Sequence, residues 1–444
     1  MPGAEVALPV RRLRDLSEPE RERRLRRSSE AILGARTREY ARRVLEDVER
    51  DGDRAVATYT LRWDGVTLPA DGPRVPPARL AAALGGIEPD LRAALEAAIA
   101  RARRYNEWLR PSPYAQVELE PGVTVGVRFV PVRSVGLYVP SGKGTFPSTL
   151  VTMGTPATVA GVERVAVVVP PRRDGGVDPA VLAAAHLLGI TEVYVCNGAA
   201  GVASLAVGTA AIPRVDALVG PGNPVVAAVQ LAAAAWGVRP LVLLGPTESI
   251  VLADDAADPD RLALDLLTEA EHGTDSAVLL LCTDAALAAR TAARLADGLA
   301  RLPEPRRTYA RAALTDLGGL FVVDDLDEGL AWINRYAPEH LQLAVRDPLR
   351  VAADVRHAGE VLAGQHTPFA AANYAVGVPA ALPTGGAAFA ASGITVLSFL
   401  KATSLAMLTE AGLDALAPVA ARLGTHEEFP AHVLAVTGRG KEAR

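Results

Sequence analysis

The sequence predicts an α/β protein with two tandem Rossmann-like parallel-sheet domains, an N-terminal helical segment and a C-terminal helical tail. Short runs of Val, Leu and Ile alternate with Ala-rich amphipathic segments, which is typical of a parallel sheet that is covered on both faces. Turns that contain Gly or Pro follow many of these apolar runs. Hydrophobic residues make up 50% of the 444 residues and aromatic residues only 5%, so the core must consist mainly of Ala, Val and Leu.

Residues 1–122 are expected to form the N-terminal helical segment. Residues 36–51 and 78–108 carry apolar side chains at three- and four-residue spacing, which indicates two amphipathic helices. Residues 59–76 between them contain several Gly and Pro residues and are predicted to form a loop or an irregular hairpin. Residues 123–131 then alternate apolar and polar side chains, as a half-buried strand does.

The first Rossmann-like domain is expected over residues 123–245. Its apolar runs predict strands at 135–139, 165–169, 193–196, 217–219 and 241–244. Helices are predicted between them at 147–160, 179–188, 201–209 and 224–236.

The second Rossmann-like domain is expected over residues 246–395, and the tail over residues 396–444. The predicted strands are 250–253, 277–282, 321–323 and 360–362, and the predicted helices are 259–272, 285–300 and 326–336. Residues 364–395 are rich in Ala, Gly and Pro with little periodicity, a composition that is typical of an active-site loop. Residues 396–434 are predicted to return to helix.

Composition excludes several classes of protein. Lys and Arg number 46 against 51 Asp and Glu, so the formal charge of -5 provides no basic field for nucleic acid. Two cysteines, Cys196 and Cys282, cannot staple a secreted fold, which predicts a reducing cytoplasm. The N-terminus has no apolar core of signal length, and the longest apolar stretches fall far short of the ~20 residues that span a bilayer. The Arg-rich residues 10–27 contain acids and are interpreted as a solvated helix face.

Glu269 and His272 are the first candidates for chemistry. They lie three residues apart at the end of the predicted helix 259–272, with Gly273 at the C-cap position, so they share one face. A carboxylate and an imidazole at this spacing can hold one divalent cation. The alternative is a C-terminal histidine that the helix dipole stabilises.

Glu339 and His340 are adjacent and follow Pro338, which fixes the local backbone. Such a pair can supply one base for an alcohol proton and a second base for water. The alternative is an ordinary exposed turn. Glu427 and His432 form a third pair around Pro430, and the alternative there is a surface histidine near the C-terminus.

Four Gly-containing turns are predicted to connect strands to helices. Backbone N–H groups at helix N-termini bind anions, and glycine lets a ligand approach closely, so four such turns in series favour a nucleotide-binding edge. None of them has the G-x-G-x-x-G pattern, and a plain turn is the alternative for each. The turns are 140–149, 197–201, 220–223 and 245–247.

Together these segments resemble the histidinol dehydrogenase family from about residue 20 to residue 437. Their order and spacing are those of the family. The matching stretches are PVRSVGLYVPSGKGTFPSTLVTMGTPATVAGV at 131–162, VASLAVGT at 202–209, IPRVDALVGPGN at 212–223, GPTESIVLAD at 245–254, LLTEAEHG at 266–273, YAPEHL at 336–341 and LPTGG at 382–386.

The resemblance implies a zinc-dependent homodimer that binds NAD on the first Rossmann-like domain. It implies oxidation of a primary alcohol through an aldehyde to a carboxylate in two hydride transfers. Glu339 and His340 match the two catalytic bases. His340 would take the alcohol proton, and Glu339 would activate water for the aldehyde step.

The resemblance also assigns the remaining site residues by position. The C-terminal segment that carries Glu427 and His432 would cross to the partner subunit. The zinc-ligand positions hold Glu269, His272, Asn373 and His432, the NAD-contacting positions Tyr138 and Asn223, and the substrate-contacting positions Thr247 and Glu427.

Several positions depart from the family pattern. The first zinc position is normally Gln and is Glu269 here, whereas the third is normally Asp and is Asn373. This exchange keeps two oxygen donors and the same formal charge, so a metal site remains possible. The family's substrate-contacting His is Ala380, its NAD-contacting Gln is Ala200, and the segment PFAAANY is apolar where a Glu is usual.

These departures lead to three hypotheses. The leading one is an NAD-dependent, zinc-assisted dehydrogenase that oxidises a small alcohol, because the family includes lineages with other small alcohols as substrates. The second is oxidation of histidinol itself, against which the missing imidazole at Ala380 counts. The third is a non-catalytic relative that binds a metabolite or a partner, against which the retained pair of Glu339 and His340 counts.

Overall fold

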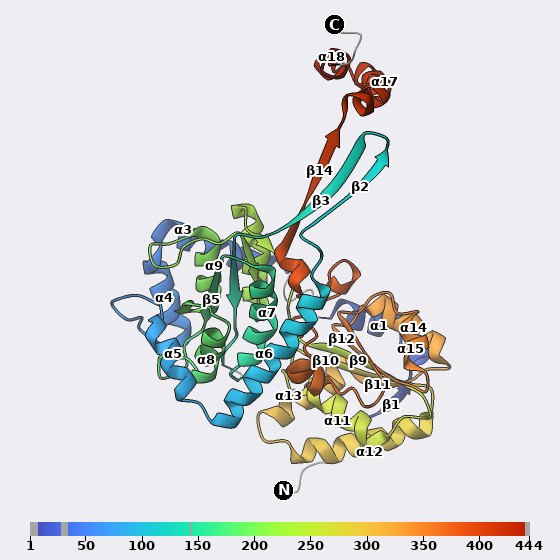
Figure 1. The fold of residues 1–444 in the computed structure, drawn as a ribbon. Helices are drawn as coiled ribbons and strands as arrows, with labels where there is room; N and C mark the ends of the chain where they lie inside the picture. The colour runs from blue at the N-terminus through green and yellow to red at the C-terminus, as the bar shows by residue number, and fades with distance from the viewer. Residues whose placement is uncertain (1–7, 28–33, 143, 440–444) are drawn as a thin grey trace. The chain divides into compact units, whose positions relative to one another are not determined.

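The structure is a computed structural model that describes residues 8–27, 34–142 and 144–439. It divides into two compact units, Met1–Trp108 with Arg133–Ser398 and Leu109–Val132 with Phe399–Arg444. The first unit contains two parallel sheets, so the predicted fold class is confirmed (Figure 1). One sheet lies within the first predicted Rossmann-like range, and the other combines strands of the second range with residues 10–12. Among the described residues, none of the helices has the length and apolar character that crossing a membrane requires.

The first sheet is parallel and has the strand order β6-β5-β4-β7-β8. Helices α9 and α10 share one hydrophobic core with its strands, and α3 and α4 pack onto these helices. The strands are β4 (Ser134–Tyr138), β5 (Arg164–Val169), β6 (Glu192–Val195), β7 (Ala217–Val219) and β8 (Arg239–Pro240). The helices are α3 (Ala35–Asp51), α4 (Asp53–Asp64), α7 (Pro147–Ala160), α8 (Pro179–Leu187), α9 (Gly198–Val207), α10 (Pro224–Ala232) and the 3-10 turn η2 (Ala233–Trp236).

The second sheet is also parallel, with the strand order β1-β11-β10-β9-β12-β13. One face is covered by α11, α12 and α13, and the other by α14 and α15. The strands are β1 (Val10–Arg12), β9 (Glu248–Ala253), β10 (Ala277–Cys282), β11 (Gly319–Val322), β12 (His340–Ala344) and β13 (Glu360–Ala363). The helices are α11 (Pro259–Ala270), α12 (Ala285–Arg301), α13 (Arg306–Ala312), α14 (Leu326–Tyr336) and α15 (Pro348–Ala352).

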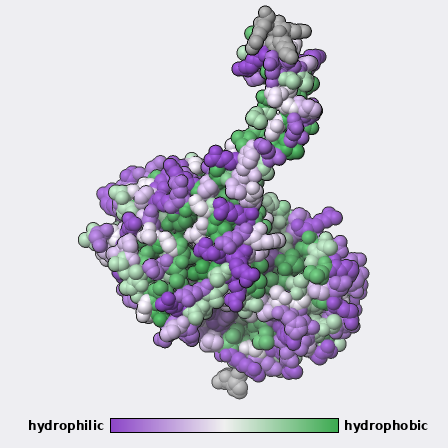
Figure 2. Space-filling model, in the orientation of Figure 1, coloured by the Kyte–Doolittle hydropathy of each residue, from purple (hydrophilic) through white to green (hydrophobic). Residues whose placement is uncertain are grey.

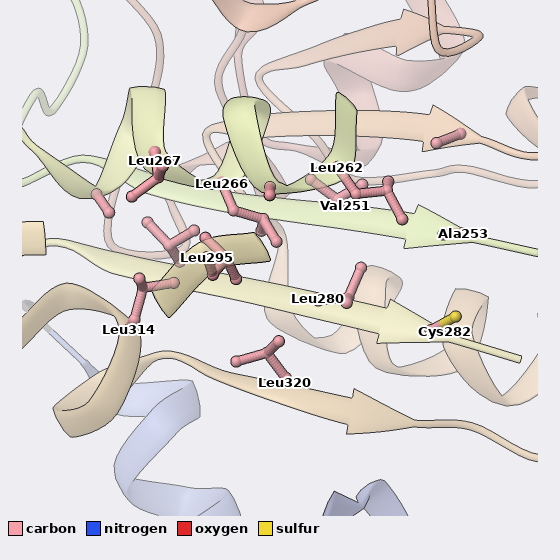
Figure 3. Packing of buried hydrophobic residues seen from close by; sticks show 14 of the residues in the cluster. Val251, Ala253, Leu262, Leu266, Leu267, Leu280, Cys282, Leu295, Leu314 and Leu320 are labelled. Carbon is pink, nitrogen blue, oxygen red and sulfur yellow. The ribbon is translucent and has the colours of Figure 1, made fainter. Parts of the chain in front are cut away.

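Helix α11 matters most for the site, and its sequence explains its place. The Asp258 carboxylate accepts a hydrogen bond from the N–H of Asp260, and Pro259 occupies the first turn, so the helix begins there. Its apolar face, which includes Leu262 and Leu266, lies over strands β9 and β10 (Figure 3). Burial of such a leucine contributes about 2 kcal/mol, so the helix is held firmly against the sheet.

The second unit contains an antiparallel sheet of order β14-β3-β2, followed by two helices that pack on each other. Its elements are β2 (Tyr114–Glu120), β3 (Val123–Pro131), β14 (Leu400–Leu408), α17 (Glu410–His426) and α18 (Pro430–Thr437). Figure 2 shows hydrophobic residues on the surface of this unit. The large hydrophobic side chains exposed there include Val117, Leu119, Leu405, Met407, Leu408, Val419, Leu423, Phe429 and Leu434.

The prediction of helix over residues 396–434 was wrong for 400–408. This segment pairs with β3 along its whole length, and the pairing outweighs its weak helical pattern. Residues 114–120, placed in the helical segment, likewise form the strand β2. The domain boundaries that the sequence predicts, including the start of the C-terminal tail, stay predictions.

Smaller differences have local causes. Residues 78–108 form two helices, α5 (Pro77–Gly85) and α6 (Pro89–Leu109), because Gly85 and Gly86 interrupt the pattern. Helix α4 extends to Asp64, into the predicted loop, and residues 241–244 form no strand. The Arg-rich segment 10–27 is not simply solvated, because it contributes β1, η1 (Leu13–Asp15) and α1 (Glu18–Arg26) and buries Arg24 and Arg27. Among its described residues, the predicted loop 364–395 contains only short helical turns, which are α16 (Phe369–Ala371), η4 (Ala372–Val376) and η5 (Ala387–Phe389). Two further short turns, η3 (Ala313–Leu317) and η6 (Val396–Phe399), lie outside this loop.

Candidate active site

The candidate active site lies at the amino ends of three adjacent strands of the second sheet. Glu248 begins β9, His340 begins β12 and Glu360 begins β13. Because these strands are parallel neighbours, their first residues lie along one edge. The C-terminal end of α11 brings Glu269 to the same edge, since helices that follow parallel strands run back in the opposite direction.

His340 is the centre of this site and is only 4% exposed. Its Nδ1 lies 2.5 Å from Oε1 of Glu360, while its Nε2 lies 3.7 Å from Oε1 of Glu339 and 3.8 Å from Oε2 of Glu269. The ring of Phe369 packs edge-on against the imidazole, with 5.8 Å between centroids. Burial favours the neutral ring, but the three carboxylates outweigh it and raise the pKa of His340 to about 10.

Glu339 is also buried, and one hydrogen bond holds it. The backbone N–H of Glu248 donates to its Oε2 at 3.0 Å. Burial raises the pKa of Glu339 to about 8, although His340 and the hydrogen bond from Glu248 favour the charged form. A carboxyl group with a pKa near 8 can take and return a proton at neutral pH.

Three of the four predicted metal ligands lie together. Glu269 is fully buried, and its Oε1 accepts a hydrogen bond of 3.1 Å from Nδ2 of Asn373. Its Oε2 lies 4.0 Å from Nε2 of His272 and has no hydrogen-bond partner among the described residues. The side chain of His272 is 40% exposed, and its Nδ1 lies 3.3 Å from Oγ1 of Thr247.

This group fits a zinc ion on its donor chemistry. A buried carboxylate oxygen without a hydrogen-bond partner is costly unless something binds it, and an imidazole and an amide stand beside it. Among the described residues, no group of three or more His, Cys, Asp or Glu side chains could hold a metal ion. The amide of Asn373 is outside that count, and the role of Glu269, His272 and Asn373 as zinc ligands stays a prediction.

A buried ion pair between Arg27 and Glu248 supports Glu339 indirectly, through the backbone of Glu248. Nε of Arg27 lies 2.7 Å from Oε1 of Glu248, which also accepts a hydrogen bond from the N–H of Gly385. The guanidinium stacks on the ring of Tyr336 at 3.7 Å. This arrangement fixes the backbone of Glu248, whose N–H in turn holds the Glu339 carboxylate.

Sequence reasoning missed four residues of this edge. Glu248 and Glu360 could have been suspected because each is a charged residue that begins an apolar strand, whereas Arg27 follows helix α1 and carries no such signal. Asp265 lies on the apolar face of α11, where a charge is unusual, and its Oδ2 accepts a hydrogen bond of 2.7 Å from Nε2 of Gln342. The alternative interpretation of Glu339 and His340 as an exposed turn is wrong, because His340 begins a buried strand.

The predicted NAD positions lie at the carboxyl edge of the first sheet. Tyr138 ends β4, and burial raises its pKa. A Cβ atom added to Gly198 would come within 2.8 Å of the Tyr138 ring, and one added to Gly222 within 3.2 Å. The ring of Tyr138 therefore packs closely against both glycines, which leaves no space for a larger side chain at either position, and the NAD-contacting role of Tyr138 and Asn223 stays a prediction.

The anion-binding role predicted for the four turns needs correction. Side-chain oxygens of Asn197 and Asn223 already accept the first N–H groups of α9 and α10. Residues 245–247 precede the strand β9 instead of a helix. By contrast, α7 begins at Pro147 within the turn 140–149 and has no side-chain cap, although the N–H of Thr149 already donates to the carbonyl oxygen of Phe146, so the anion-binding role of this turn stays a prediction.

Glu427 and His432 belong to the second unit. Glu427 caps the C-terminus of α17, where its N–H donates to the carbonyl oxygen of Leu423, and its side chain is exposed. His432 lies in α18 and packs on Phe429, with 5.1 Å between the ring centroids. The structure thus brings Glu269, His272, Asn373, Glu339, His340 and Thr247 to one site, and the roles of all predicted site residues stay predictions.

The fold and the site define a two-sheet α/β protein with a buried acid–base pair beside a carboxylate–imidazole set. A family model of histidinol dehydrogenase matches residues 27–440. Histidinol dehydrogenase from Synechocystis sp. is 40% identical over 422 residues, which cover 95% of this chain and 96% of that protein. A histidinol dehydrogenase homolog from Colwellia psychrerythraea is 36% identical and covers 98% of this chain and 97% of its own. The crystal structure of histidinol dehydrogenase from Elizabethkingia anophelis has a TM-score of 0.89, 29% sequence identity and 98% coverage of both chains.

The chain therefore belongs to the histidinol dehydrogenase family. Histidinol dehydrogenases are oxidoreductases, so the class of enzyme follows from the family. The predicted family is confirmed.

Proposed function

We propose that this protein is an NAD-dependent, zinc-assisted dehydrogenase that oxidises a primary alcohol through its aldehyde to the carboxylate. The observation that carries the proposal is the buried pair of Glu339 and His340 beside Glu269. Burying three ionisable groups together is unfavourable unless they serve chemistry, which counts against the non-catalytic alternative.

The two bases have different tasks in this reaction. Nε2 of His340 faces Glu339 and Glu269 and takes the proton of the alcohol. Glu339 takes a proton from water, so that the resulting hydroxide adds to the aldehyde. When bound, zinc supplies a Lewis acid for the alcohol oxygen and NAD accepts the hydride in each of the two steps.

The protonation of His340 depends on the charge of its neighbours. The attraction of Glu269 is the first of the effects that oppose burial and raise the pKa of His340. A cation held by Glu269 would offset this attraction and would favour the neutral, basic form of His340. Glu269, His272 and Asn373 would hold that cation, and His432 would complete the set.

Histidinol is the first substrate to consider, because relatives at 40% identity over 95% of the chain carry that name. A second candidate is a different small alcohol. Ala380 stands where the family has a substrate-contacting His, and Phe369, from a segment that is acidic in the family, is fully buried against His340. Both features favour a substrate without an imidazole.

The proposal includes a homodimer, with the second unit as the interface. Its sheet and helices expose large hydrophobic side chains such as Met407, Leu423 and Leu434, each between 56% and 69% exposed. A second copy of this chain is the occupant that the family resemblance implies. Exchange of this unit would bring Glu427 and His432 to the site of the other copy. The two cysteines are free and buried, which supports a cytoplasmic location.

The decisive experiment measures NADH formation together with metal content and molar mass. Histidinol and a panel of amino and hydroxy alcohols are supplied to the zinc-loaded protein, and kcat/KM is compared between them. We expect about one zinc per chain, a dimer by light scattering and about two molecules of NADH formed for each molecule of alcohol consumed.

The outcome separates the candidates. A histidinol kcat/KM above that of every other alcohol supports histidinol as the substrate, and a higher value for an alcohol without an imidazole supports the second candidate. No bound metal and no NADH from any alcohol would contradict the proposed function.

A further inference from the structure

The contacts of His340 with three carboxylates are uneven. Oε1 of Glu360 lies at hydrogen-bond distance from Nδ1, at 2.5 Å, whereas the oxygens of Glu339 and Glu269 lie 3.7 and 3.8 Å from Nε2. The two ring nitrogens therefore face different groups. One nitrogen is held tightly, and the other points to the residues of the proposed chemistry.

The pairing of two strands determines this contact. Strands β12 and β13 are parallel, and their first residues, His340 and Glu360, are register partners. Side chains of register partners point to the same face of a sheet, so the two groups must meet. The N–H of Glu360 also donates to the carbonyl oxygen of Glu339 at 3.0 Å, which fixes the start of β13.

Glu360 has no other evident structural task. Its side chain is 7% exposed, and among the described residues its Oε1 bonds to His340 alone while Oε2 is buried without a hydrogen-bond partner. A buried carboxylate with a single partner costs stability compared with an apolar residue. A purely structural position on β13 would be filled better by an apolar side chain, as at Leu362.

We propose that Glu360 is a positioning residue that sets the orientation and tautomer of His340. A neutral imidazole carries one N–H, and a carboxylate beside Nδ1 accepts that hydrogen. The lone pair then lies on Nε2, which faces Glu339 and the substrate side. This inference rests on the proposed function, in which Nε2 of His340 takes the alcohol proton.

The kinetic test compares Glu360→Ala with Glu360→Gln in the zinc-loaded dimer. Glu360→Ala removes the acceptor, and we expect kcat to fall about 100-fold while KM for the alcohol and for NAD changes less than threefold. Glu360→Gln keeps an oxygen that can accept from Nδ1, so we expect it to recover at least tenfold of this loss. The neighbouring side chain of Val361 points to the other face of β13 and is exposed, so the variant Val361→Ala is expected to retain the wild-type kcat.

A second readout does not require turnover. In protein labelled with ¹⁵N-histidine, the Nδ1–H of His340 should give a low-field proton resonance, which His340→Gln assigns by its loss. We expect this resonance to disappear or move in Glu360→Ala and to persist in Val361→Ala. Bound zinc should stay the same in all Glu360 variants.

The two readouts distinguish the two proposals. Wild-type protein that oxidises no alcohol but shows the Glu360-dependent resonance contradicts the proposed function and supports the contact. A Glu360→Ala variant with wild-type kcat and an unchanged resonance overturns the positioning role. The positioning role is also overturned if Glu360→Gln folds and keeps the wild-type resonance but has a kcat as low as that of Glu360→Ala.

Discussion

The two parallel sheets of the first unit share one architecture but bury different side chains at different strand ends. Between residues 134 and 240, the described buried polar side chains are all neutral: Ser134, Thr155, Asn197, Ser204 and Gln230. Between residues 246 and 395 they include the ionisable groups Glu248, Asp265, Glu269, Glu339 and His340. The predicted NAD positions follow the carboxyl ends of the first sheet, whereas the acid–base pair begins a strand of the second.

This difference fits the proposed function, in which the two sheets of a duplicated architecture have two different tasks. In the proposed function, the neutral edge of the first sheet would bind NAD. Buried ionisable groups are costly, so they are expected where proton transfer needs perturbed pKa values. The comparison predicts that substitutions in the second sheet lower kcat, and that substitutions in the first raise KM for NAD.

The largest expected effect would come from His340→Ala, which removes the proposed base of the second sheet. We expect kcat to fall about 1,000-fold, within the range for loss of a general base, with little change in KM for NAD. Steady-state measurement of NADH formation checks this. The exposed His366, which contacts Arg261, provides the control His366→Ala with the wild-type rate. A change in KM alone would remove the distinction between the sheets.

Zinc affinity tests the exchange of carboxylate and amide. Glu269→Gln leaves amides at both oxygen positions, so we expect the affinity for zinc to fall about 100-fold. Adding Asn373→Asp restores one carboxylate to this set of side chains, so the affinity of the double variant for zinc should be within about tenfold of that of the wild type. Competition with a chromophoric chelator measures both. Equal affinity of the single and double variants would show that the charge is not needed.

In the first sheet, Gly198→Ala should act on cofactor binding. The added Cβ would lie 2.8 Å from the ring of Tyr138, which must move. We expect KM for NAD to rise about tenfold, equivalent to about 1.4 kcal/mol, with kcat reduced less than twofold. Gly85→Ala is the matched control, because nothing lies within 4 Å of its added Cβ. A fall in kcat without a change in KM would contradict the division of tasks.

The last expected effect concerns folding stability and its dependence on pH. Burial is the main reason that the pKa of Asp265 rises to about 6 from an ordinary 3.8. A raised acid pKa means that the folded state holds its proton more tightly, so the contribution of Asp265 to stability is full below pH 3.8 and is lost as pH rises through 6. Asp265→Asn removes this loss. The free energy of unfolding at pH 8 minus that at pH 4 should therefore be larger in the variant than in the wild type, by on the order of 2 kcal/mol. Denaturant unfolding at the two pH values measures it, and an unchanged difference would show that Asp265 is not perturbed.

The sequence predicted those parts that depend on local pattern. The alternation of apolar runs and amphipathic helices identified both parallel sheets, and the spacing of Glu269 and His272 predicted that they lie together. The predicted helix end was wrong, because α11 ends at Ala270 with Glu271 as its C-cap, so His272 lies just beyond the helix and Gly273 is not the cap. What it could not predict depends on pairing between distant segments. Residues 400–408 become a strand only because β3 pairs with them, and Glu360 meets His340 only through the register of β12 and β13.

The position of β13 in its sheet has a further consequence. It is the last strand in the order, has four residues and pairs with β12 alone among the described strands. Fraying of such an outer strand requires less free energy than melting the central ones. Warming should therefore detach the carboxylate beside His340 before the fold is lost, so that reversible inactivation would precede the cooperative thermal transition.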